Sequence, residues 1–130
     1  AVPAALGLQI ASGRRPLVLV GDGAFQMTGP EISHAGQHGC NPVIVLFNNS
    51  RWEMLQAFFP DANYNATVPW PFAKMAELWG GRGVNARTPR QLRDALAAAW
   101  LVGRLTMRAR WTVGPRPPGP WKSAAALTRS

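Results

Sequence analysis

Two short runs of apolar residues decide the fold of this chain: LVLVGDG at residues 17–23 and PVIVLFNN at residues 42–49. Continuous apolar runs of this length are typical of strands that are covered on both faces in a parallel sheet. Each run ends in polar residues. Because the carboxyl ends of neighbouring parallel strands meet at one edge of the sheet, these polar residues are expected to lie together.

The segment between the two runs, TGPEISHAGQHG at residues 28–39, predicts a helix of about ten residues. Thr28 stands three positions before Glu31, which is the spacing of a capping box, and Gly39 is suited to end the helix. Residues 17–47 are therefore expected to form a strand, a helix and a strand, which is the right-handed βαβ unit.

Three further segments have helical patterns, and they predict an α/β domain in which helices flank a parallel sheet. The segments are PAALGLQIAS at residues 3–12, PFAKMAELWGG at 71–81 and TPRQLRDALAAAW at 88–100. Thr88 is the expected N-cap of the last one. The glycines of GGRGV at 80–84 lack the spacing of a phosphate-binding loop, so a turn from helix to strand is expected there.

Asp22 and Asn49, which are 27 residues apart, are candidates for sharing a metal ion. Neighbouring strands lie about 4.8 Å apart, so oxygens at their ends can reach one cation. Mg²⁺ takes oxygen ligands at about 2.0–2.1 Å and is often bound by few carboxylates together with phosphate oxygens. One carboxylate, one neutral amide and a backbone carbonyl therefore suit a magnesium diphosphate. Gly21 and Gly23 are expected to allow positive φ and a close approach of the backbone to this anion.

The composition indicates one globular domain. Of the 130 residues, 47% are hydrophobic and 15% are charged, a balance found in folded proteins and not in disordered ones. No apolar run approaches the roughly 20 residues of a membrane-spanning helix and no signal peptide is recognised, so a soluble, cytoplasmic protein without membrane contact is expected. Cys40 is the only cysteine, which excludes an internal disulfide, and it is expected to be buried.

The net charge of +8 is concentrated near the C-terminal end of the sequence. Residues 1–100 contain eight Lys/Arg and six Asp/Glu, whereas residues 101–130 contain six Lys/Arg and no acid. No nucleic-acid-binding motif accompanies these basic residues, so nucleic acid is not an expected partner. In this Arg/Pro/Trp-rich tail, RLTMRARWTV at 104–113 alternates in a way that suits an edge strand. The alternative is that the native reading frame is lost soon after Trp100, which would leave the tail disordered and without a role.

Other polar and aromatic residues have structural explanations. His34 and His38 stand four apart with Glu31 nearby, but the HExxH order of a zinc site is absent, so an exposed or packed helix surface is expected. The larger aromatics are expected to lie in the core or in an interface and not to stack on a substrate. They are Trp52, Trp70, Trp79 and Trp100.

The GDG and NN motifs, in this order and spacing, resemble the signature of thiamine diphosphate-dependent enzymes, with Asp22 and Asn49 at the matching positions. GDGAFQMTGPEIS, NPVIVLFNNSRWEML and the later YN pair resemble the 2-oxo acid decarboxylase branch. That branch contains pyruvate, indolepyruvate and phenylpyruvate decarboxylases, and the resemblance to phenylpyruvate decarboxylase is strongest. It covers residues 1–100 and implies part of a Rossmann-like, C-terminal thiamine diphosphate-binding domain, followed by the basic tail at 101–130.

The resemblance also implies roles for single residues. Asp22 and Asn49 would bind Mg²⁺ through their side chains, and Arg51 would bind it through its backbone carbonyl. The residues that would contact the thiamine diphosphate are Gly21, Asp22, Gly23, Ala24, Asn49, Arg51, Trp52, Glu53 and Met54. No catalytic residue is assigned. The implied partners are a 2-oxo acid and the pyrimidine-binding domain of a second subunit, in a homodimer or homotetramer.

The chain departs from pyruvate decarboxylases at one informative position. Those enzymes have a glutamate six residues after the second asparagine, where this chain has Leu55. The leucine implies a more apolar pocket and an aromatic or branched 2-oxo acid, such as phenylpyruvate or indolepyruvate. The chain is too short to hold the pyrimidine-binding domain as well, so it is expected to be inactive alone. The open alternatives are a non-catalytic magnesium diphosphate-binding module, an inert truncated product, and another thiamine diphosphate enzyme of the acetolactate synthase kind.

Overall fold

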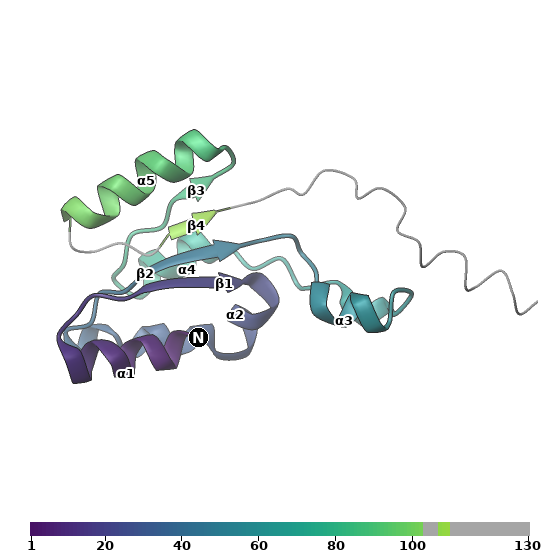
Figure 1. Ribbon diagram of the computed structural model, residues 1–130, viewed down its shortest axis with the longest axis horizontal. Coiled ribbons are helices and arrows are strands. Elements are labelled where there is room, and N and C mark those ends of the chain that lie inside the picture. Colours follow the sequence, from purple (N-terminus) through teal and green to yellow (C-terminus); the bar gives the residue numbers. More distant parts are fainter. Residues whose placement is uncertain (103–106, 110–130) are drawn as a thin grey trace, which may run out of the picture.

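A four-stranded sheet with helices on both faces forms the described part of the chain (Figure 1). The computed structural model describes residues 1–102 and 107–109. The strands are β1 (Leu17–Gly21), β2 (Val43–Phe47), β3 (Asn85–Ala86) and β4 (Met107–Ala109). The α-helices are α1 (Val2–Ser12), α2 (Asp22–Thr28), α3 (Glu53–Phe58), α4 (Phe72–Leu78) and α5 (Pro89–Val102). The 3₁₀ helices are η1 (Gly29–His34), η2 (Gly36–His38) and η3 (Asn63–Asn65). The expected α/β class is confirmed.

The strands pair in parallel, in the order β1-β2-β4-β3. β1 and β2 pair from Leu17 opposite Val43 to Gly21 opposite Phe47, and helical turns connect them, so the expected βαβ unit is confirmed. β4 pairs with β2 on one side and with β3 on the other. The predicted edge strand is therefore wrong in its position, because residues 107–109 lie inside the sheet. The rest of that predicted strand lies outside the described residues.

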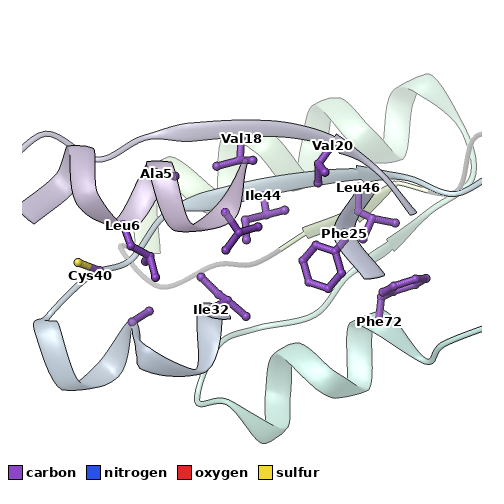
Figure 2. Close-up of a cluster of buried hydrophobic side chains, with 12 residues drawn as sticks. Ala5, Leu6, Val18, Val20, Phe25, Ile32, Cys40, Ile44, Leu46 and Phe72 are labelled. Carbon is purple, nitrogen blue, oxygen red and sulfur yellow. The ribbon is translucent and has the colours of Figure 1, made fainter. Parts of the chain in front are cut away.

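Two apolar clusters, one on each face of the sheet, form the core. Figure 2 shows the larger one, in which α1, α2, η1 and α4 contribute side chains that pack on β1 and β2. Its buried members are Val2, Ala5, Leu6, Val18, Val20, Phe25, Ile32, Ala35, Cys40, Ile44, Leu46 and Phe72. On the opposite face, Ala95 and Ala99 of α5 cluster with Val43. Trp70 and Trp79 pack against the larger cluster, as expected of core aromatics.

The outer strand β1 is covered on one face only. Val18 and Val20 are buried, whereas Leu17 and Leu19 are 47% and 62% exposed. The expectation that this run is covered on both faces is therefore wrong. β1 is at the edge of the described sheet, and α5 packs on β3 and β4 at its other side. The neighbouring strand β2 is buried on both faces, except at its last residue, Phe47.

The helix between β1 and β2 begins earlier than the sequence predicted. α2 starts at Asp22, directly after β1, and 3₁₀ turns follow it. Thr28 makes no side-chain cap hydrogen bond, so the predicted capping box is wrong. Pro30 has no N–H to continue the α-helical bonding pattern, which explains why α2 stops before it. Gly39 has a φ of 63° and ends the 3₁₀ segment, as predicted for a terminating glycine.

Both ends of α5 are held by side chains. Oγ1 of Thr88 accepts a hydrogen bond from the N–H of Gln91 at 3.2 Å, so the predicted N-cap is confirmed. At the other end, the Arg15 guanidinium donates to the carbonyl oxygen of Ala99 at 2.6 Å and to that of Asn41 at 2.5 Å. Partial burial lowers the pKa of Arg15. These bonds tie α5 to the segments that lead into β1 and β2.

The expectation about the single cysteine also has an outcome. Cys40 is buried among apolar side chains, as predicted. In residues 1–102 and 107–109, the structure contains no helix that is both long and apolar enough to cross a bilayer.

Candidate functional site

The polar ends of β1 and β2 lie at the same edge of the sheet. In the parallel register, Gly21 is opposite Phe47, the last residue of β2. Asp22 follows Gly21 and Asn48 follows Phe47, so the chain leaves both strands at neighbouring points. Asn49 is one residue further on. The predicted meeting of the two motifs at one edge is confirmed.

Asp22 is a buried carboxylate that is held by a hydroxyl group. Its exposed fraction is 2%, and Oγ1 of Thr67 donates a hydrogen bond to its Oδ2 at 2.7 Å. In the described part of the chain, no Lys, Arg or His forms an ion pair with Asp22. A buried negative charge is costly unless a cation or several donors compensate it. The environment of Asp22 therefore favours the binding of a cation.

The loop after β2 holds Asn49 through both ends of its amide. Oδ1 accepts a hydrogen bond from the backbone N–H of Arg51 at 3.0 Å, and Nδ2 donates to Oε2 of Glu53 at 3.1 Å. These two partners fix which way the amide group is turned. An amide oxygen has two lone pairs, so Oδ1 keeps the capacity to bind a cation while it accepts one N–H.

A tight turn brings Arg51 against a second segment of the chain. Ser50 has a φ of 59°, in the left-handed region, and Oδ1 of Asn48 accepts a hydrogen bond from its N–H at 3.1 Å. Arg51 then forms an antiparallel bridge with Ala66. The N–H of Thr67 donates to the carbonyl oxygen of Ser50 at 3.1 Å. The loop that carries Asn49 therefore also positions Thr67, the partner of Asp22.

Gly23 is required for a reason that the sequence did not reveal. A Cβ at this position would lie 2.8 Å from Cε3 of Trp52, because the indole ring packs directly on the glycine. Gly21 has a φ of −76°, and Gly23 is not among the residues with positive φ in the described chain. The prediction that these glycines use positive φ is therefore wrong. Gly23 allows close packing, and Gly21 has open space where its Cβ would be.

The other predicted lining residues lie on helices that begin at this edge. Ala24 is in the first turn of α2 and is exposed. Glu53 and Met54 begin α3, and Met54 is 73% exposed. Trp52 is half-buried against Gly23. The structure brings these residues to the ends of the two strands, and their contact with a ligand stays a prediction.

His34 and His38 are exposed, as predicted for a helix surface, whereas Trp100 does not lie in the core. Nε2 of His34 lies 3.6 Å from Oε2 of Glu31, and both side chains are more than half exposed. Within the described ranges, no three His, Cys, Asp or Glu residues are grouped so that they could hold a metal ion. Trp100 is 54% exposed, and its ring lies 5.7 Å from the Arg15 guanidinium. Any metal site at Asp22 must therefore use ligands besides carboxylates and imidazoles.

Residues 1–107 match the family described as thiamine pyrophosphate enzyme, C-terminal TPP binding domain. The chain belongs to this family. The match covers the two strands that end in the GDG and NN motifs and the loop that carries Thr67. Family membership therefore confirms the resemblance and identifies the cofactor class that domains of this kind bind.

Two curated proteins that are similar to this chain are named as decarboxylases. Indole-3-pyruvate decarboxylase of Azospirillum brasilense is 47% identical over 100 residues, which cover 76% of this chain and 18% of that protein. A probable pyruvate decarboxylase of Schizosaccharomyces pombe is 36% identical over 104 residues, covering 75% of this chain and 18% of that protein. The chain thus spans about a fifth of the length of these curated relatives.

A solved structure has the same arrangement of elements. The thiamine diphosphate-dependent 4-hydroxybenzoylformate decarboxylase of Rhodococcus jostii RHA1 aligns with a TM-score of 0.80 and 25% sequence identity. The alignment covers 89% of this chain and 23% of that one. The α/β architecture described above is therefore that of the cofactor-binding domain of the family.

Proposed function

We propose that this chain is the cofactor-binding part of a thiamine diphosphate- and Mg²⁺-dependent decarboxylase of 2-oxo acids. The observation that carries the proposal is the buried carboxylate of Asp22, which lies at the same sheet edge as Asn49 and forms no ion pair within the described residues. Family membership supports the cofactor. The names of the similar proteins support the reaction class.

The residues at this edge fit a magnesium ion. Asp22 would supply a carboxylate oxygen, Asn49 its amide oxygen, and Arg51 its backbone carbonyl. In the described ranges, no donor is bound to that carbonyl. A set of oxygen ligands with a single negative charge suits Mg²⁺ when a diphosphate supplies further oxygens. A cluster of carboxylates would instead repel the diphosphate.

The neighbouring residues fit the rest of the cofactor. Those that would line the diphosphate and the thiazolium ring are Gly21, Gly23, Ala24, Trp52, Glu53 and Met54. The indole of Trp52 gives this edge an apolar wall, and Gly21 leaves room for the anion close to the backbone. When bound, the thiazolium supplies a sink for the electrons released as CO₂ leaves a 2-oxo acid. The residues of this chain bind and orient that group.

Leu55 supports an aromatic or branched 2-oxo acid as the substrate. It is half-buried in α3, two residues after Glu53, the partner of Asn49. A leucine at this place favours a substrate with a large apolar side chain over pyruvate, which has only a methyl group, since apolar contacts discriminate by size. The substrates that we favour are phenylpyruvate and indolepyruvate. One similar protein is named for indole-3-pyruvate.

A second subunit would complete the active site. We propose that residues 1–100 are part of the cofactor-binding domain, that 101–130 are a basic tail, and that the pyrimidine-binding domain comes from a partner copy in a homodimer or homotetramer. The nucleotide sequence beyond codon 100 tests whether the tail is in the native frame. A cytoplasmic location also stays a prediction.

The test uses the full-length gene product that contains this chain. With thiamine diphosphate and Mg²⁺, it is expected to release CO₂ from phenylpyruvate or indolepyruvate faster than from pyruvate. Asp22→Ala should abolish both turnover and Mg²⁺-dependent cofactor binding, whereas Asp94→Ala, an exposed aspartate on α5, should alter neither. Cofactor binding without CO₂ release from any 2-oxo acid would favour the non-catalytic binding module. The absence of both would refute the proposal.

A further inference from the structure

Thr67 is the only side chain in the described part of the structure that donates a hydrogen bond to the carboxylate of Asp22. We propose that Thr67 is a positioning residue of the metal site, which holds Oδ2 of Asp22 and leaves Oδ1 to face the magnesium ion. This inference rests on the proposed function, because the metal site belongs to it.

The contact has the properties of a strong, shielded hydrogen bond. The distance from Oγ1 to Oδ2 is 2.7 Å, and the exposed fractions of Thr67 and Asp22 are 8% and 2%. Bonds from a hydroxyl to a carboxylate are stronger than neutral ones, and water does not compete well in a buried site. In the part of the chain that the structure describes, Oδ1 receives no hydrogen bond. The two oxygens of one carboxylate thus have different surroundings.

The backbone holds Thr67 in place independently of Asp22. Its N–H donates to the carbonyl oxygen of Ser50 at 3.1 Å, beside the bridge between Arg51 and Ala66. Burial alternates along this extended segment: Thr67 is buried, whereas Ala66 and the next residue, Val68, are exposed. The backbone therefore directs the hydroxyl inward, toward Asp22, before any ligand binds.

A second contact anchors the same segment without touching the carboxylate. Nε2 of Gln26 donates to the carbonyl oxygen of Val68 at 2.6 Å. Gln26 and Asp22 are four residues apart in α2, so they lie on the same helix face. α2 thus has two links to this segment, and only one of them reaches the candidate metal ligand. Gln26 therefore provides a matched control for the role of Thr67.

The chemical consequence is a carboxylate that binds a metal ion through one oxygen. Mg²⁺ needs near-octahedral geometry, which a single carboxylate oxygen suits, whereas Ca²⁺ accepts both oxygens of one carboxylate and a more flexible array. Partners in the shell around metal ligands typically change metal affinity by roughly 10- to 100-fold when they are removed. Loss of the Thr67 hydroxyl should therefore weaken Mg²⁺ binding more than Ca²⁺ binding.

The experiment measures metal affinity and not turnover. Isothermal calorimetry on the full-length gene product, at a fixed concentration of thiamine diphosphate, gives the affinities for Mg²⁺ and for Ca²⁺. Thr67→Val, which removes the hydroxyl at nearly constant volume, should weaken Mg²⁺ binding by about tenfold or more. Thr67→Ser should restore affinity close to that of the wild type. Gln26→Leu should lower the melting temperature but leave Mg²⁺ affinity unchanged.

Four results would overturn the inference. The first is that Thr67→Val binds Mg²⁺ as tightly as the wild type, and the second is that Thr67→Ser binds Mg²⁺ as weakly as Thr67→Val. The third is that Gln26→Leu binds Mg²⁺ as weakly as Thr67→Val. The fourth is that Thr67→Val loses affinity for Mg²⁺ and for Ca²⁺ by the same factor. If Thr67→Val does not fold, Thr67→Ala replaces it in the same comparison. A wild-type protein that binds neither metal with the cofactor would refute the proposed function as well. Wild-type binding with an unaffected Thr67→Val variant would refute the role of Thr67 alone.

Discussion

Replacing each glycine of the GDG motif with alanine shows whether the glycine is needed for close packing or for its backbone conformation. In Gly23→Ala, the new Cβ would lie 2.8 Å from Cε3 and 2.9 Å from Cδ2 of Trp52. Ordinary contacts begin near 3.4 Å, so the indole would have to move by about 0.6 Å or the start of α2 would have to shift. Overpacking of this kind costs about 1–3 kcal/mol of unfolding free energy.

Gly21→Ala is the matched control. Gly21 has a φ of −76° and a ψ of 158°, which alanine adopts without strain. Apart from Gly21 and its two neighbours in the chain, no described residue has an atom within 4 Å of its Cβ position. Because alanine lowers the conformational entropy of the unfolded chain, Gly21→Ala should leave stability unchanged or raise it by up to about 1 kcal/mol. The two substitutions therefore have opposite expected effects, although the residues belong to one motif.

Chemical denaturation of the wild type and both variants, followed by circular dichroism, measures these effects. Tryptophan fluorescence of the native proteins reports whether the surroundings of an indole have changed in Gly23→Ala. The reasoning is refuted if Gly23→Ala is as stable as Gly21→Ala. It is also refuted if Gly21→Ala loses more than about 1 kcal/mol, since a loss of that size would indicate a backbone conformation that needs glycine.

Three other predictions concern the parts of the fold that support the site, and denaturation curves check each one. Gly83→Ala should destabilise the protein by about 3 kcal/mol or more, because its Cβ would collide with a backbone carbonyl of α4, whereas Gly36→Ala, with open space around it, should have little effect. Thr88→Ala should cost about 0.5–2 kcal/mol through loss of the α5 N-cap, and Thr28→Ala, which removes no cap, should cost less than about 0.5 kcal/mol. Arg15→Met should cost about 1–3 kcal/mol, because it removes charged hydrogen bonds to carbonyls at the end of α5 and just before β2.

The parts of the fold that could be predicted are those that depend on local patterns. Two apolar runs indicated parallel strands, and their ends located Asp22 and Asn49 at one edge. The Thr88 cap was also predictable, since a cap depends on residues three positions apart. The start of α2 was misplaced because Thr28 was interpreted as the N-cap of the helix, whereas α2 begins at Asp22 and Thr28 is its last residue.

The features that the sequence did not predict depend on contacts between residues that are distant in sequence. Thr67 was not singled out, because it lies 45 residues from Asp22 and its neighbours in sequence give no signal of that contact. The packing of Trp52 on Gly23 likewise required the loop after β2 to fold back over α2. The exposed face of β1 could not be foreseen either, since the sequence of a strand does not reveal which helices cover it.

The most direct test of the central claim is a crystal structure of the full-length protein with Mg²⁺ and thiamine diphosphate. We expect one ion with a carboxylate oxygen of Asp22 and the amide oxygen of Asn49 both at about 2.0–2.1 Å, together with diphosphate oxygens. An ion that is bound by only one of these side chains, or a cofactor held at another edge of the sheet, would contradict the account.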